Sequence, residues 1–131
     1  MPLLYDAPNP APNPRRVRIY LSEKGLSVPT QSVSIVAGEH KSADYVAKYT
    51  PGQVPALELD DGTVIGESIA ICRYFEALHP EPPLFGHDPL SIAVIDMWSR
   101  RVELTLMNPV GQVWMHTHLD PQFGDFALRV G

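Results

Sequence analysis

The 131-residue sequence predicts an α/β domain with the element order β-α-β-α-β-β-α, followed by the first part of an all-helical region. Three observations support this fold class. Short apolar runs that alternate with polar residues, or that stop at turn residues, indicate strands. Longer segments with apolar residues three and four positions apart indicate helices. Fourteen prolines fall in clusters between these segments, where proline interrupts regular structure and marks the boundaries.

The first three elements form a strand–helix–strand unit. Residues 3–5 are a short apolar run that stops at a segment rich in proline and asparagine. Asn13 followed by Pro14 predicts a helix start, because asparagine is a good N-cap and proline is tolerated in the first turn. Gly25 predicts the end of this helix, and alternating residues 33–36 predict a second strand. This order implies a right-handed crossover and a parallel strand pair.

The next four elements complete the predicted domain. A short helix is expected over residues 42–49, with a serine as its cap. Strands at 56–59 and 64–66, joined by an Asp-Gly turn at 61–62, predict an antiparallel hairpin. Residues 68–78 predict a helix with one apolar face.

A proline-containing connector at residues 81–88 separates the predicted α/β domain, residues 1–80, from a helical region at 89–131. The helix that begins at the connector is expected to kink or end at Pro109, which lacks a backbone donor. The helical region alone is too short to bury its own apolar face, so large side chains should be exposed there. They include Met97, Trp98 and Trp114.

Composition excludes several classes of function. The net charge is −5 and no block of Lys or Arg is present, which argues against nucleic acid or an anionic membrane as the main partner. Arg15, Arg16 and Arg18 form a short basic cluster that we expect to be a solvated helix face, with an anion-facing role as the alternative. A single cysteine and the lack of an apolar leader or spanning segment predict a cytoplasmic protein.

Three segments carry a resemblance to a known family. They are RRVRIYLSEKGL at 15–26, PGQVPALELDDG at 51–62 and GESIAICRYFE at 66–76. In order and in separation they resemble the corresponding stretches of cytosolic glutathione transferases. The resemblance implies a thioredoxin-like fold, with the helix from Pro89 as the first of the family's all-helical C-terminal domain. It also implies a homodimer, with Arg73 near the interface.

The resemblance implies that glutathione is bound, that its thiol is activated, and that it is transferred to, or used to reduce, a small electrophile. A cis Val54-Pro55 bond would let the main chain of Val54 pair with the cysteinyl part of the peptide, the alternative being an ordinary trans proline. Ser68 would bind the γ-glutamyl carboxylate and Glu67 its ammonium group, unless both only cap a helix. The glycyl carboxylate would meet the side chains of His40, Lys41 and Gln53. The alternative for His40 and Lys41 is that they are only charges on a solvent-facing loop.

The group that stabilises the thiolate is where this sequence departs from the family. No hydroxyl or thiol occurs between Asp6 and Tyr20, where many members place one. Asn13 is the best replacement because its side-chain amide can donate to a thiolate, although it would serve equally well as a plain N-cap. Asn9 is a weaker candidate, and Tyr5 is more readily explained as a buried core residue.

The remaining reactive side chains are not expected to take part in catalysis or metal binding. Cys72 is expected to be an inert buried thiol, and no metal site is expected at His116 and His118. Two other hypotheses remain open: a glutathione-binding or subunit-binding module without turnover, and a disulfide reductant, which is disfavoured because no Cys-x-x-Cys is present. The electrophile, and whether this chain is active by itself, are not determined by the sequence.

Overall fold

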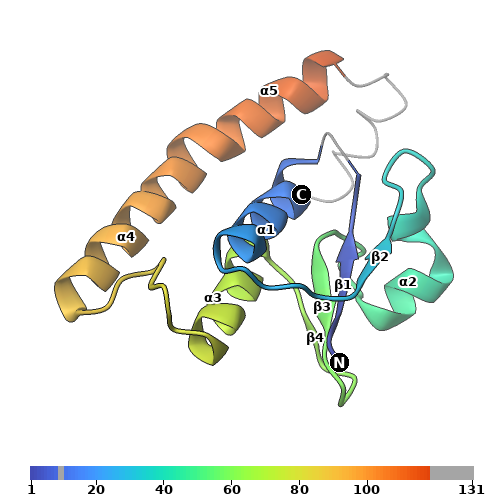
Figure 1. The fold of residues 1–131 in the computed structure, drawn as a ribbon. Coiled ribbons are helices and arrows are strands. Elements are labelled where there is room, and N and C mark those ends of the chain that lie inside the picture. Colours follow the sequence, from blue (N-terminus) through green and yellow to red (C-terminus); the bar gives the residue numbers. More distant parts are fainter. Residues whose placement is uncertain (9–10, 119–131) are drawn as a thin grey trace. The chain divides into compact units, whose positions relative to one another are not determined.

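The computed structural model describes residues 1–8 and 11–118, and the chain divides into two compact units, Met1–Leu84 and a second that begins at Phe85. The first unit is a mixed sheet with helices on both sides, as Figure 1 shows. Its element order is the predicted β-α-β-α-β-β-α, with one additional short 3-10 helix. The predicted thioredoxin-like fold class is therefore confirmed.

The sheet has four strands in the order β2-β1-β3-β4. Strand β1 pairs in parallel with β2, and it pairs antiparallel with β3, which forms a hairpin with β4. Central β1 therefore contributes two of the most completely buried large side chains, Leu4 and Tyr5, which are 2% and 1% exposed. The strands are β1 (Leu3–Asp6), β2 (Thr30–Ser32), β3 (Ala56–Glu58) and β4 (Val64–Ile65).

Strand β2 lies earlier in the chain than the sequence predicted. Its pairing with β1 ends where Val33 N–H donates to the Asp6 carbonyl at 2.7 Å. The residues that follow form a turn. In it the Ser34 N–H donates to the Glu39 carboxylate, and the Ser34 hydroxyl oxygen accepts from the Ala37 N–H. The alternation over 33–36 was therefore misleading, because only the buried Val33 packs against the sheet.

Helix α1 (Pro12–Glu23) begins two residues earlier than predicted, and its N-cap is Ala11 rather than Asn13. Asn13 is the second helical residue, and its side chain is exposed and makes no capping bond. Two prolines are accommodated here because the N–H groups of a first turn have no intrahelical acceptor to lose. The prediction of Asn13 as the N-cap was wrong for this reason.

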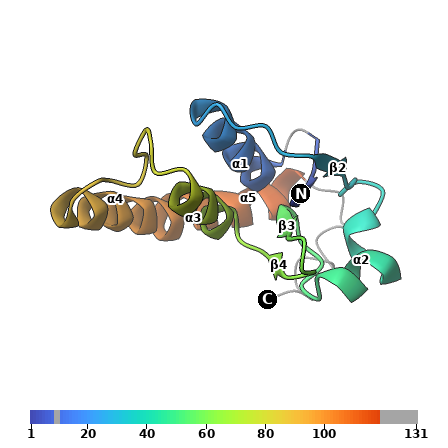
Figure 2. The ribbon, with the colours of Figure 1, turned by 60° about the horizontal axis from the view of Figure 1, so that its bottom comes forward.

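Helices α1 and α3 (Ser68–Leu78) pack together on one side of the sheet, and α2 (Ala43–Lys48) lies on the other, in both Figure 1 and Figure 2. The two packed helices run in the same direction. Near their amino ends Arg16 contacts Ser68, and near their carboxyl ends Tyr20 contacts Glu76. Two positive helix ends consequently lie side by side.

A buried lysine joins the carboxyl ends of α1 and α3 to the connector. The Lys24 side chain is 0% exposed, and its ammonium lies 2.8 Å from the Glu76 carboxylate. It also donates to the His79 and Pro82 carbonyls at 2.6 and 2.5 Å. The other Glu76 oxygen accepts from the Leu84 N–H, so one ion pair holds both helices and the chain that leaves them.

The second unit contains α4 (Pro89–Val102), a π-helical segment η2 (Glu103–Met107) and α5 (Asn108–His118). Asp88 begins α4 with a capping box, since it accepts from the Leu90 and Ser91 N–H groups and Ser91 bonds back to it. Of the two outcomes predicted at Pro109, a kink or an end, the end is not found, because α5 continues through it. A widened π turn precedes it, and proline is tolerated so close to the start of a new helix.

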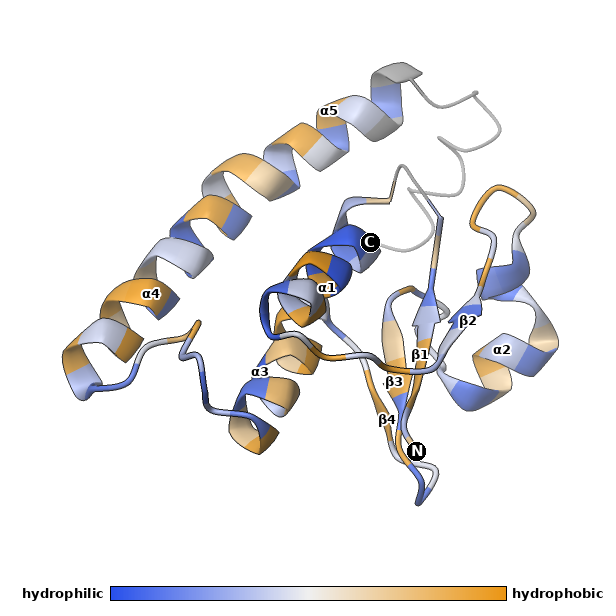
Figure 3. Cartoon of the chain, in the orientation of Figure 1, coloured by the Kyte–Doolittle hydropathy of each residue, from blue (hydrophilic) through white to orange (hydrophobic). Residues whose placement is uncertain are grey.

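The described part of the second unit leaves much apolar surface exposed, and Figure 3 shows apolar residues recurring along both helices. Met97, Trp98 and Trp114 are 39%, 56% and 44% exposed, as the sequence predicted. No helix among the described residues is long and apolar enough to cross a membrane.

Candidate functional site

The loop before β3 carries the sharpest predicted feature. The Val54–Pro55 peptide bond is cis, as predicted; a second cis bond, Glu81–Pro82, was not anticipated. Gly52 turns the chain into this loop with a φ of 56°, and an added Cβ would lie 2.8 Å from the His40 carbonyl oxygen. Only glycine therefore fits, and the loop packs closely against the segment that contains His40.

The main chain of Val54 is unpaired. Within the described residues, neither its N–H nor its C=O makes a hydrogen bond, although the residue is half-buried. Backbone polar groups that are withdrawn from water are nearly always paired. A donor and an acceptor on one residue, next to the end of a strand, are what an added extended peptide requires.

The three side chains predicted for the glycyl carboxylate differ in their environments. His40 is 8% exposed, and its pKa is lowered by burial and by the neighbouring Lys41 charge, so it is neutral at pH 7. The Lys41 ammonium donates to the Pro51 carbonyl at 3.1 Å. The Gln53 side chain is exposed, and the backbone carbonyl of Gln53 accepts from the Tyr45 hydroxyl at 2.7 Å. The fold thus brings the segment that contains His40 and Lys41 next to the loop that contains Gln53, whose side chain is exposed to solvent.

The amino end of α3 carries the second predicted group. Glu67 is the N-cap with a φ of 63°, and its side chain makes no capping hydrogen bond. Ser68 is the first helical residue and is 5% exposed. Its hydroxyl oxygen accepts a 2.9 Å hydrogen bond from Nη1 of Arg16. The predicted alternative, that Glu67 and Ser68 act as side-chain caps, is therefore not what the structure contains.

Tyr49 connects the two groups, and sequence reasoning missed it. Its ring packs with Val54 against the core cluster around Tyr5 and Ala56. A Cβ at Gly66 would lie 1.8 Å from the Tyr49 hydroxyl oxygen, so the ring covers the backbone that leads into Glu67. Burial, and then the Glu67 charge, raise the Tyr49 pKa. The glycine before Glu67 was the available signal, because such a glycine often marks close approach of another group.

The amino end of α1 offers few donors. Of its first three residues only Asn13 has a backbone N–H, because Pro12 and Pro14 have none. The N–H of Arg15, the next residue, already bonds to the Ala11 carbonyl at 3.4 Å. Asn13 therefore supplies the only backbone N–H of the first three helical residues and the only side-chain amide among them.

The other residues considered for thiolate stabilisation have different environments. Tyr5 is 1% exposed, donates its hydroxyl to Glu58 and accepts from Lys48 at 3.1 Å, so the expectation of a core tyrosine is confirmed. Burial, followed by Glu58, raises its pKa, and its hydroxyl proton is already donated to Glu58. Asn9 lies outside the described residues. Cys72 is buried, as predicted, and burial raises the pKa of its thiol to about 12.

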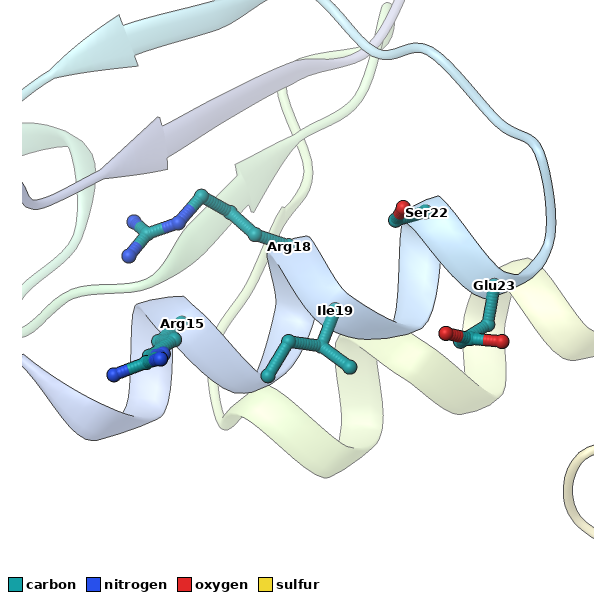
Figure 4. Close-up of a pocket in the computed structure, with 5 residues that line it drawn as sticks. All are labelled: Arg15, Arg18, Ile19, Ser22 and Glu23. Atoms are coloured by element: carbon teal, nitrogen blue, oxygen red, sulfur yellow. The ribbon is translucent and has the colours of Figure 1, made fainter.

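The hollow in Figure 4 is separate from these groups. It is open, lies on the outer face of α1, and all of its lining residues come from that helix: Arg15, Arg18, Ile19, Ser22 and Glu23. Arg18 bonds to Asp6 at 2.6 and 2.8 Å and to the Ala7 carbonyl, so its charge is balanced within the fold. None of these five was predicted as a site residue. Among the described residues no cluster of acidic, cysteine or histidine side chains has the arrangement of a metal site.

The basic cluster of α1 is divided by the structure. Arg15 is exposed and Arg18 pairs with Asp6, but Arg16 turns inward to Ser68. The prediction of a solvated face is thus wrong for Arg16. Two successive arginines at the positive end of a helix were the signal, since cations are disfavoured there.

Comparison with known proteins gives a consistent result. Residues 11–78 match the model of the family described as glutathione S-transferase, N-terminal domain. Glutathione S-transferase 2 of Saccharomyces cerevisiae is 45% identical over 124 residues, which are 93% of this chain and 52% of that protein. This chain therefore spans about half the length of that relative.

Two solved structures are similar to the fold. A glutathione S-transferase domain-containing protein of Marinobacter aquaeolei is 38% identical, with a TM-score of 0.79 over 98% of this chain and 68% of that one. A glutathione transferase homologue from Sulfitobacter, solved with bound glutathione, is 26% identical, with a TM-score of 0.76 over 99% of this chain and 63% of that one.

Proposed function

Since this chain belongs to the glutathione S-transferase family, through a match to its N-terminal domain, we propose that its first unit binds glutathione and activates the thiol for attack on a small electrophile. Glutathione is in this case a substrate rather than a resident cofactor. The thiolate of the bound peptide is the nucleophile, so the protein has to bind, orient and stabilise an anion.

The unpaired main chain of Val54 is the observation that carries this proposal. An extended peptide lying antiparallel to residues 53–55 satisfies both the N–H and the C=O of Val54 with its cysteinyl residue. The peptide is then held at its two ends. Its γ-glutamyl carboxylate meets the hydroxyl of Ser68 and the amino end of α3, while Glu67 meets the γ-glutamyl ammonium.

The glycyl end would lie over the loop that contains Gln53. The exposed Gln53 amide is available as a donor, and the Lys41 ammonium adds attraction for a carboxylate. His40 is neutral at pH 7 because burial lowers its pKa, so it contributes a hydrogen bond rather than a charge.

Thiolate stabilisation is assigned to Asn13. A thiol with an ordinary pKa near about 8.5 is only partly ionised at neutral pH, and modest stabilisation of the anion changes that fraction greatly. Asn13 supplies a backbone N–H and a side-chain amide at the positive end of α1, where its neighbouring prolines supply neither.

Calorimetric titration of the folded chain with glutathione tests binding, and the absorbance of the thiolate across pH tests activation. We expect binding at millimolar glutathione or below and a lowered thiol pKa. Asn13→Ala should raise the pKa of bound glutathione while leaving binding largely intact. If Asn13→Ala leaves the thiolate titration where it was, the assignment of Asn13 is wrong.

A module that binds glutathione without turnover is the alternative, and the large exposed apolar surface of α4 and α5 favours it for this chain by itself. Such surface calls for covering, and a homodimer is the form we propose. Turnover of a generic electrophile distinguishes the enzyme from the module, and sedimentation distinguishes dimer from monomer. Binding without turnover would select the module.

A further inference from the structure

Arg16 contacts the predicted carboxylate site but has no role in the proposals above. It lies in the first turns of α1, and its Nη1 donates a 2.9 Å hydrogen bond across to Ser68 Oγ on α3. Arg16 is only partly exposed and Ser68 is buried. Within the described residues this is the only hydrogen bond of the guanidinium, which has five N–H donors.

The charge on Arg16 is placed where a helix disfavours it. Partial positive charge gathers at the amino end of every helix, so acidic residues are preferred there and cations are not. Neither α1 nor α3 has an acidic residue in its first turn. These two amino ends lie side by side, and Arg16 lies between them. Local rules that are broken in this way usually mark a functional site.

The direction of the hydrogen bond has a chemical consequence. A guanidinium can only donate, so Ser68 Oγ must accept from Arg16, and its own proton must point elsewhere. A serine hydroxyl without such a neighbour rotates freely or turns its proton back to a carbonyl of its own helix. The contact with Arg16 thus leaves the Ser68 hydroxyl as a fixed donor, made stronger by the adjacent charge.

We propose that Arg16 is a positioning residue that orients the Ser68 hydroxyl, and that together they select a ligand with a carboxylate at the amino end of α3. This inference rests on the proposed function, in which that carboxylate is the α-carboxylate of the γ-glutamyl group. Arg16 acts through Ser68, so its effect depends both on Ser68 and on the carboxylate of the ligand.

Two ligands test this dependence by calorimetric titration of the full chain. One is glutathione, and the other is γ-aminobutyryl-cysteinyl-glycine, which lacks only the α-carboxylate. Arg16→Met should weaken glutathione binding by about ten- to a hundredfold, the effect of losing a hydrogen bond to a charged group. It should leave binding of the second peptide unchanged within about twofold.

Arg15→Met is the matched control. Arg15 is the neighbouring arginine with the same charge, but it is exposed and lies on the outer face of α1, as Figure 4 shows. We expect it to change the affinity for either peptide very little. Equal losses from Arg15→Met and Arg16→Met would mean that only the general field of α1 matters, and the inference would be overturned.

Ser68→Ala supplies the second control. If Arg16 acts through Ser68, then adding Arg16→Met to Ser68→Ala should cost little further affinity. An undiminished effect of Arg16→Met in that background would overturn the inference. Should Arg16→Met fail to fold, as judged by circular dichroism, Arg16→Lys replaces it; any loss there must again be confined to glutathione, and a loss for both peptides counts against the inference.

The titrations distinguish a failure of the proposed function from a failure of the role of Arg16. If the wild-type chain binds neither peptide, the proposed function fails. If it binds glutathione and Arg16→Met binds it equally well, the proposed function stands and only the role of Arg16 is removed.

Discussion

Replacement of Lys24 by methionine should destabilise the first unit more than any other single lysine change. The side chain is 0% exposed, and its ammonium lies 2.8 Å from the Glu76 carboxylate. Methionine keeps the apolar stem and removes the charge. The two carbonyls that lose their donor belong to exposed residues, His79 and Pro82, and water can replace the lysine there.

Glu76 determines the magnitude. Its side chain is only 14% exposed, so without Lys24 its carboxylate stays largely buried and loses the ammonium that lies 2.8 Å away. It keeps hydrogen bonds from Tyr20 and from the Leu84 N–H, which limit the loss. Breaking a buried pair by removing one partner costs about 3–5 kcal/mol, and we take the lower end, about 3 kcal/mol. For a unit of this size that lowers the Tm by about 12–24 °C.

Urea denaturation followed by far-ultraviolet circular dichroism measures this change. Lys48→Met is the control, because Lys48 also pairs with a glutamate and a tyrosine but its side chain is 50% exposed. We expect the Lys48→Met midpoint to move far less. If Lys24→Met unfolds at the same urea concentration as Lys48→Met, the assignment of Lys24 as the residue that holds α1, α3 and the connector together is refuted.

Three further outcomes are expected. Gly66→Ala places a Cβ 1.8 Å from the Tyr49 hydroxyl and should cost about 1–3 kcal/mol by overpacking; a urea midpoint equal to wild type would contradict this, and Tyr49→Ala should remove most of the penalty. Burial lowers the pKa of His40 below 6.5, so the unfolded chain binds more protons than the folded one just under that pH, and stability should fall as the pH drops through this range. His40→Gln should flatten that slope, and an unchanged slope would remove the explanation. Burial also raises the pKa of Cys72 to about 12, so native chain at neutral pH should resist alkylation until it unfolds; prompt labelling of the native thiol would show that the site is open.

Local sequence patterns predicted most elements of the first unit because each of them follows short-range rules. Ser42 caps α2 by accepting from the Tyr45 N–H, and Gly62 forms the turn of the β3–β4 hairpin with a φ of 84°. Strand β2 was misplaced because strand pairing is decided by the partner. Backbone bonds to β1 fix it at Thr30–Ser32, whose side chains are all exposed, so no hydrophobic pattern identified it.

Some residues of the candidate site were predicted from the sequence, and others were not. Val54, Pro55, Glu67 and Ser68 were found because the segments that contain them resemble a known family. Tyr49 was not found, because its relation to Gly66 joins residues that are far apart in the chain and leaves no periodic signal. Asn13 was proposed for its side-chain amide, and only the alternative of a plain N-cap is wrong, since it lies inside α1.

The sequence by itself determined the fold class, the family, the burial of Cys72 and the exposure of the apolar side chains in α4 and α5. Composition, spacing and local turn chemistry carry that information along the chain. Only the tertiary structure decided that Arg16 turns inward to Ser68, that Lys24 is buried beside Glu76, and that the main chain of Val54 has no hydrogen bond to the part of the chain that the structure describes. Each of these depends on which distant groups the fold brings within hydrogen-bond distance, and that follows from the packing of α1 against α3 and of the loop against the sheet.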